Sequence, residues 1–173
     1  MKKTTLLLTI LFLTISAKAQ TEKGNWMFGG DAILQGYKFE NQDKFIYYAE
    51  IFPKVGYFIK DQFVIGSEVG IYINNSTFYK SLVPFTRYYF FDNEKIIKPF
   101  IEGGLGFKNV SYHKLSSGTP SVNEFMYQFK VGTSLFFTNS VALNLTFNYK
   151  KNSFNFDEEL SLAFGFQIHL RKK

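Results

Sequence analysis

The sequence predicts an all-β chain: an eight-stranded antiparallel up-and-down transmembrane β-barrel, preceded by a signal peptide. Three observations predict this fold. Lipid-compatible side chains recur at every second residue through eight segments, and a period of two is that of a β-strand. The apolar face of these segments carries almost no charge. The connections alternate between short polar turns and longer loops, as they do in membrane barrels.

The first nineteen residues have the composition of an export signal. Lys2 and Lys3 precede a mostly apolar run over residues 6–15, and Ala17-Lys18-Ala19 supplies a small-x-small cleavage site. The apolar run is too short to span a bilayer as a helix. We therefore expect a cleaved signal peptide at residues 1–19 and a single barrel domain at residues 20–173.

Composition excludes several function classes. The chain has no cysteine, so it has neither disulfides nor thiol chemistry. The formal charge falls from +6 to +3 on cleavage, because the signal contains Lys2, Lys3 and Lys18 and no acid. This excess is small and scattered, which does not indicate a nucleic-acid partner. No cofactor is expected.

The eight strands are predicted from the alternation of apolar and polar residues, bounded by turn-forming segments. They cover residues 25–37, 44–60, 63–74, 79–91, 95–108, 123–137, 140–150 and 159–171. Three connections are short enough for hairpin turns, at residues 61–62, 92–94 and 138–139. The longer connections are 38–43, 75–78, 109–122 and 151–158. Both ends of the barrel domain are expected at the short-turn rim.

The charged residues of the strands occupy the alternate positions that are predicted to face inward. The predicted interior charge network consists of Glu50, Lys54, Glu68, Arg87, Glu102 and Lys130. Asp31 has a less clearly marked parity. All but Glu50 and Asp31 lie about five to eight residues from the nearest short turn, or roughly 13–20 Å above that rim. Inward glycines accompany them, because eight strands leave room only for side chains. We interpret the network as a structural plug, with a gate or proton path as the alternative.

Three segments carry a family resemblance. They are Pro53-Lys54-Val55-Gly56-Tyr57-Phe58, Pro84-Phe85-Thr86-Arg87-Tyr88-Tyr89-Phe90 and Pro99-Phe100-Ile101-Glu102-Gly103-Gly104-Leu105-Gly106. They resemble strand patterns of the small eight-stranded OmpA/OmpX-type outer-membrane β-barrels. The resemblance implies residence in the outer membrane of a Gram-negative bacterium, contact with outer-membrane lipid and insertion by the barrel-assembly machinery. We expect a monomer.

The residues show no catalytic constellation and no metal site. His113 lies beside Ser111 and Tyr112, and Glu124 is a nearby acid in the sequence. A nucleophile, a base and an orienting group are needed for acyl transfer, so this set leaves a lipid A-modifying barrel enzyme as a minor alternative. His169 is expected to face the lumen, without the cluster of ligands that a metal requires.

The longest loop and the last one contain aromatic and charged residues. These candidates for binding a surface ligand are Tyr112, His113, Lys114, Phe154 and Phe156. Loops carry function more often than the scaffold that holds them. The alternative is ordinary loop packing.

The predicted function is that of a non-enzymatic outer-membrane barrel with a plugged interior, which supports the membrane and displays its loops. A narrow porin-like solute channel is a second reading, against which stand the inward Phe52, Phe85 and Phe100. A third reading is a soluble lipocalin-like binder of apolar ligands, with the two faces inverted, since Gly24-Asn25-Trp26 resembles a lipocalin start. Its polar face would carry too few charges for a soluble surface.

Overall fold

The computed structural model describes residues 21–37, 46–73, 77–91, 95–112, 121–152 and 158–171. Its strands are β1 (Trp26–Tyr37), β2 (Ile46–Lys60), β3 (Phe63–Ile73), β4 (Thr77–Tyr89), β5 (Ile97–Tyr112), β6 (Ser121–Phe136), β7 (Val141–Asn152) and β8 (Glu158–Leu170). The signal predicted at residues 1–19 lies outside the described residues. Among those described, no helix is long and apolar enough to cross a bilayer.

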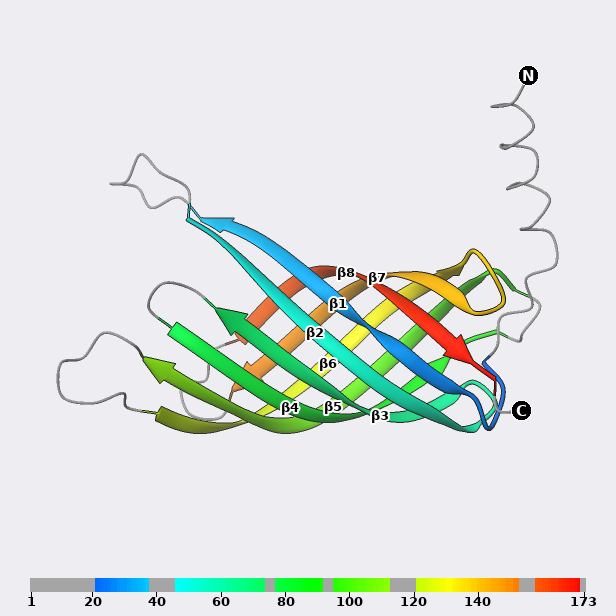
Figure 1. Ribbon diagram of the computed structural model, residues 1–173, viewed down its shortest axis with the longest axis horizontal. Helices are drawn as coiled ribbons and strands as arrows, with labels where there is room; N and C mark the ends of the chain where they lie inside the picture. Colours follow the sequence, from blue (N-terminus) through cyan, green and yellow to red (C-terminus); the bar gives the residue numbers. More distant parts are fainter. Residues whose placement is uncertain are drawn as a thin grey trace, which may run out of the picture.

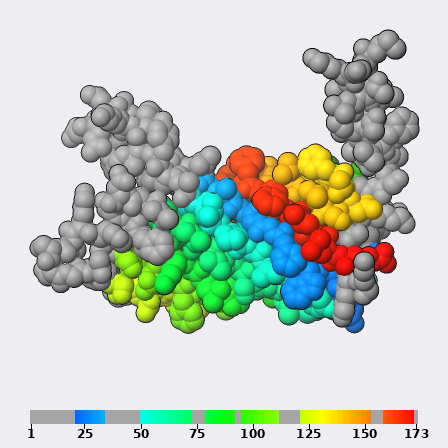
Figure 2. All heavy atoms as spheres, in the orientation of Figure 1, coloured from blue at the N-terminus to red at the C-terminus, as the bar shows by residue number. Residues whose placement is uncertain are grey.

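Each strand pairs antiparallel with the next, and β8 pairs with β1 to close the barrel (Figure 1). In the space-filling view, β8 in red lies directly against β1 in blue (Figure 2). Trp26 at the start of β1 is opposite Leu170 at the end of β8. The eight-stranded antiparallel up-and-down barrel predicted from the sequence is therefore confirmed.

The predicted loop at 109–122 was too long at both ends. Strand β5 extends to Tyr112 and β6 begins at Ser121, and Val110 pairs with Val122 and Ser111 with Ser121. The Asn109 side-chain amide also donates to Asn123 Oδ1 across the pair, at 2.7 Å. This ladder extends the hairpin because β-branched and hydrogen-bonding cross-strand pairs stabilise a sheet.

The two faces of the sheet differ in polarity, as β7 shows. Its buried residues Asn144, Thr146 and Asn148 alternate with exposed Leu145 and Phe147. On the described strands, outward charged residues occur only near the ends of the strands. They are Lys60, Lys80, Lys151 and Glu158. Apolar side chains thus form the outer wall.

The inverted, lipocalin-like arrangement is wrong for this chain, since it requires charges outside and aromatic side chains inside. Arg87 is 0% exposed, whereas Phe129 and Phe147 point outward and are about half exposed. The side chains of a soluble barrel would show the reverse.

The short-turn end of the lumen is closed by a layer of rings, which we call the aromatic floor: Phe58, Tyr89, Phe136 and His169. The His169 ring centroid lies 5.3 Å from that of Phe58 and 5.2 Å from that of Phe136. The segment before β1 adds a further contact at this end, because Lys98 Nζ donates to Thr21 Oγ1 at 2.7 Å. Each of the four floor residues is at most 1% exposed.

The outer wall has a broad depression of about 990 Å³ over β2–β5. Short side chains lie at its centre, at Ser67, Pro84 and Thr86, and a Cβ added at Gly103 would meet no atom within 4 Å. The hollow faces away from the lumen and its charged residues.

Candidate functional site

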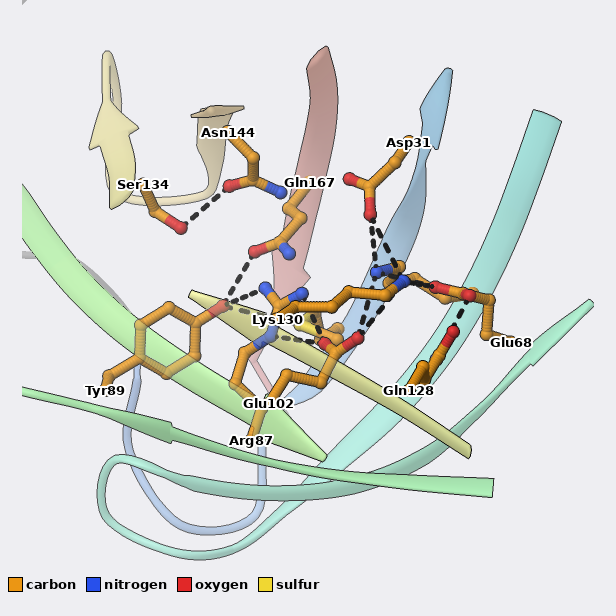
Figure 3. Close-up of polar contacts among 12 residues, drawn as sticks. Asp31, Glu68, Arg87, Tyr89, Glu102, Gln128, Lys130, Ser134, Asn144 and Gln167 are labelled. Carbon is orange, nitrogen blue, oxygen red and sulfur yellow. Dashed lines mark hydrogen bonds and ion pairs between the residues drawn. The ribbon is translucent and has the colours of Figure 1, made fainter. Parts of the chain in front are cut away.

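Six consecutive strands each contribute one charged side chain to the middle of the lumen, and the signs alternate from strand to strand. We call this set the mid-barrel network. Its members, from β1 to β6, are Asp31, Lys54, Glu68, Arg87, Glu102 and Lys130. Figure 3 shows labelled members of the set converging on the interior from separate strands.

Strand register brings neighbouring members together. Lys54 is directly opposite Glu68, and Glu102 is opposite both Arg87 and Lys130. The Lys54 ammonium lies 2.9 Å from Glu68 and the Arg87 guanidinium 2.5 Å from Glu102. These pairs follow from the inward parity of their strands.

Further contacts, between neighbouring strands and, for Lys130 with Glu68, across the lumen from β6 to β3, join the six groups into one network. Lys130 Nζ lies 2.5 Å from Glu68 Oε2 and 3.4 Å from Glu102 Oε1. Lys54 Nζ donates to Asp31 Oδ2 at 2.7 Å. Asp31, whose parity was the least marked in the sequence, is therefore an integral member.

The network contains three acids and three bases, so its formal charge is zero. Every side chain in its ion pairs is at most 1% exposed. Isolated charges buried in this way would be costly, and burial is tolerable because each group is paired and hydrogen-bonded. The six side chains thus form a formally neutral, buried network in the middle of the lumen.

Aromatic rings hold the network from the short-turn side. The Arg87 guanidinium lies 3.9 Å from the centre of the Phe100 ring, a cation–π contact. Arg87 Nη1 donates to the Tyr89 hydroxyl at 3.0 Å, and that hydroxyl donates to Gln167 Oε1 at 2.7 Å. The network and the aromatic floor are thereby connected.

Glu50 does not lie in the mid-barrel network, contrary to the sequence prediction. It is buried on the inward face, four residues closer to the long-loop end than Lys54. There it forms a second group with Lys150 and Glu159, which we call the mouth cluster. Lys150 Nζ is 3.7 Å from both carboxylates. Parity identified the correct face, but cross-strand register decides the neighbours.

The structure places few of the loop candidates. His113, Lys114, Phe154 and Phe156 lie outside the described residues, and Tyr112 is the last residue of β5. Glu124 is buried, opposite Lys108 in the β5–β6 register. Within the described ranges, no group of histidine, aspartate and glutamate residues could hold a metal ion.

Sequence reasoning missed two buried lysines, Lys98 and Lys150. Both have the inward parity of their strands, as buried Phe100 and Asn148, each two residues away, show. Lys98 was overlooked because it lies close to a short turn, and Lys150 because it ended a predicted strand. Parity counted to the last residue of each strand would have found both.

No protein-family model matches the chain. No curated protein matches it either.

Several solved structures share its fold at low sequence identity. The N-terminal β-barrel domain of Pseudomonas aeruginosa OprF matches with a TM-score of 0.68 and 13% identity, over 86% of this chain and 98% of that one. Neisserial surface protein A matches with a TM-score of 0.63 and 15% identity, over 84% and 97%. Ail of Yersinia pestis matches with a TM-score of 0.56 and 12% identity, over 86% and 99%. The chain therefore has the fold of the small eight-stranded outer-membrane β-barrels.

Proposed function

We propose that the protein is a non-enzymatic integral protein of the outer membrane of a Gram-negative bacterium. The outer wall supports this location. Exposed Leu143, Leu145 and Phe147 on β7 are followed by exposed Leu162 and Phe164 on β8. Exposed apolar area on this scale is unusual for a water-soluble protein. A charge facing lipid costs about 2–4 kcal/mol at mid-bilayer, which accounts for the restriction of outward charges to strand ends.

Cell fractionation tests the location. The protein is expected in the outer-membrane fraction, with a mobility in SDS gels that changes on boiling, because closed barrels with every strand paired resist the detergent. Recovery from the soluble periplasmic fraction would overturn the membrane assignment. A membrane pool whose mobility is the same before and after boiling would show that the barrel had not formed.

The observation that carries the functional proposal is the zero-charge network across the lumen. A plugged barrel of this kind stabilises the membrane and acts as a rigid support for its long loops. In planar bilayers, the protein is expected to give no steady conductance. Reproducible single-channel steps at neutral pH would show that the protein is a narrow channel and not a plugged barrel.

Surface interaction through the long loops is the second part of the proposal, with Tyr112, His113, Lys114, Phe154 and Phe156 as candidate contacts. A structure of Ail, one of the barrels with this fold, was solved in complex with the heparin analogue sucrose octasulfate. We therefore propose surface glycans as the class of ligand to test for the present chain. The other partners proposed are outer-membrane lipid and, during insertion, the barrel-assembly machinery.

A loop exchange tests the surface role. Residues 113–120 would be replaced by a Gly/Ser linker of equal length, and wild type and variant compared on an array of sulfated and neutral glycans. Retention of wild type alone, with both proteins equally heat-modifiable, supports binding by the loop. Equal retention of the two proteins on the array would show that this loop does not bind the glycans. Replacement of Thr138 and Asn139, in the turn at the opposite end, is the control.

A further inference from the structure

The inner wall of the barrel is asymmetric. Strands β1–β6 supply the charged network, whereas β7 and β8 supply short polar side chains at the same level. In register, Lys130 on β6 is opposite Asn148 on β7, which is opposite Ser161 on β8. Figure 3 shows Asn144 and Gln167, from these two strands, to one side of the ion pairs.

These side chains contain buried polar atoms without a hydrogen-bond partner among the described residues. On the inner wall of β7 and β8, below the mouth cluster with its Glu159, the atoms are Asn144 Nδ2, Thr146 Oγ1, Asn148 Oδ1, Ser161 Oγ and Gln167 Nε2. Asp31 Oδ1, on the neighbouring strand β1, is a sixth such atom and faces Gly165. Buried polar groups in proteins are almost always paired with protein or with ordered water.

The six atoms include both donors and acceptors, and they follow one another along the barrel. From the floor upward, the inward residues of β7 are Ala142, Asn144, Thr146, Asn148 and Lys150. A series of donors and acceptors that do not reach one another directly is the arrangement that bridging waters satisfy. The residues opposite Thr146 and Asn144 on β8 are the small Ala163 and Gly165, and the space beside Gly165 is occupied by Asp31 Oδ1 and the Gly30 carbonyl.

The upper end of this series opens at the mouth cluster. Exposure rises along β8 from 6% at Ser161 to 40% for the side chain of Glu159. A small space of about 10 Å³ lies beside Lys150 and Glu159, which is about the volume that one water centre needs. The lower end stops at Gln167, whose Oε1 is held by Tyr89 of the aromatic floor.

We propose that β7 and β8 carry a column of water that enters at the long-loop mouth, passes the mid-barrel network and ends above the aromatic floor. The inference rests on the plugged-barrel function proposed above. The barrel is then a half-channel, wet on one wall and dry on the other, with water as the ligand of the five β7–β8 side chains.

Cysteine accessibility tests the column, since the natural chain has no cysteine. Asn148→Cys is compared with Val83→Cys on β4. Both native residues are 1% exposed, and both lie about eight residues from their short turn, or ~26 Å of strand. Refolded protein in micelles is pulsed with Ag⁺, an ion of about the size of water, and the remaining thiols are alkylated after unfolding and counted by mass.

We expect Asn148→Cys and Ser161→Cys to react on the order of tenfold faster than Val83→Cys, because the dry wall must open locally before a thiol there can react. Ala142→Cys, packed against Phe136 below the column, should be as slow as Val83→Cys. Equal rates for Asn148→Cys and Val83→Cys would overturn the column.

A measurement on the wild-type protein tests the proposal even if the cysteine variants do not fold. The side-chain amides of Asn144 and Gln167 should show NMR cross-peaks to water in micelles, and absence of both would also overturn the proposal. These outcomes are separate from the membrane assignment. A protein found in the soluble fraction would lose its proposed location, while the thiol rates would still report whether the inner wall is wet.

Discussion

The mid-barrel network and the mouth cluster are built from the same kinds of residue, but their geometry differs. In the network, Lys130 and Glu68 are 2.5 Å apart and each at most 1% exposed. In the mouth cluster, Lys150 is 3.7 Å from Glu50 and from Glu159, and the Glu159 side chain is 40% exposed. Water reaches a group that has lost its partner more readily at the mouth, where Glu159 is 40% exposed, than in the network, where these side chains are at most 1% exposed. The contribution of an ion pair to the stability of this barrel is therefore expected to depend on its depth in the lumen.

The largest expected effect comes from Arg87→Met. It leaves Glu102 without its 2.5 Å partner in a fully buried position. Breaking a buried pair by removing one side costs about 3–5 kcal/mol. The free energy of unfolding can be followed in urea through the only tryptophan, Trp26, which lies on the outer wall.

The double variant Arg87→Met with Glu102→Gln separates charge from packing. It removes one acid and one base, so the remaining network stays formally neutral. We expect it to recover most of the stability lost in the single variant, because the buried network no longer carries a net charge. A double variant less stable than Arg87→Met would show that the guanidinium acts mainly by its packing against Phe100.

Glu50→Gln tests the mouth cluster. The neutral amide can still accept the hydrogen bond from the Tyr79 hydroxyl, and Lys150 keeps a second partner at 3.7 Å, the 40% exposed Glu159 carboxylate. We expect a loss of about 1 kcal/mol or less, measured in the same urea titration. The effect should shrink in 1 M salt, whereas that of Arg87→Met should persist, since salt screens exposed pairs far more than buried ones. If Glu50→Gln lowered the free energy of unfolding as much as Arg87→Met, the stabilisation from an ion pair would not depend on its depth in the barrel.

The smallest effect is expected for Lys151→Ala. Lys151 Nζ is 2.7 Å from Glu158 Oε1, but this pair is on the outside, with side chains 26% and 54% exposed. A short distance at an exposed site contributes little, because both ions remain hydrated. The urea midpoint should be unchanged, and a clear shift would mean that rim charges contribute more than their exposure indicates.

Much of the fold could be predicted because parity is a strong signal when one face meets an apolar environment. On β7, the alternation of Leu143, Asn144 and Leu145 fixes the face of each residue. The ends of strands were less predictable. Polar residues such as Ser111 and Ser121 resemble a loop in sequence, yet they pair across the β5–β6 ladder.

The candidate site could be predicted as a set of inward charges, most of them at a similar depth, but parity does not give the partner of each charge. Lys54 and Glu50 share a strand and a face, but Lys54 contacts Glu68 in the network while Glu50 contacts Lys150. The orphaned atoms of Asn144 and Gln167 depend on rotamers and on cross-strand distances, so no sequence pattern identifies them. Register, a property of the closed sheet, supplies this missing information.

The alternation of sign across β1–β6 has a consequence for assembly. Successive hairpins bring in matched charges, but a sheet that stops at an odd strand contains an unbalanced ion. A slip of one residue would turn Arg87 or Glu68 toward hydrocarbon, since a one-residue shift exchanges the two faces of a strand. Such a slip would cost free energy, so the six charges favour the native order and alignment of the strands.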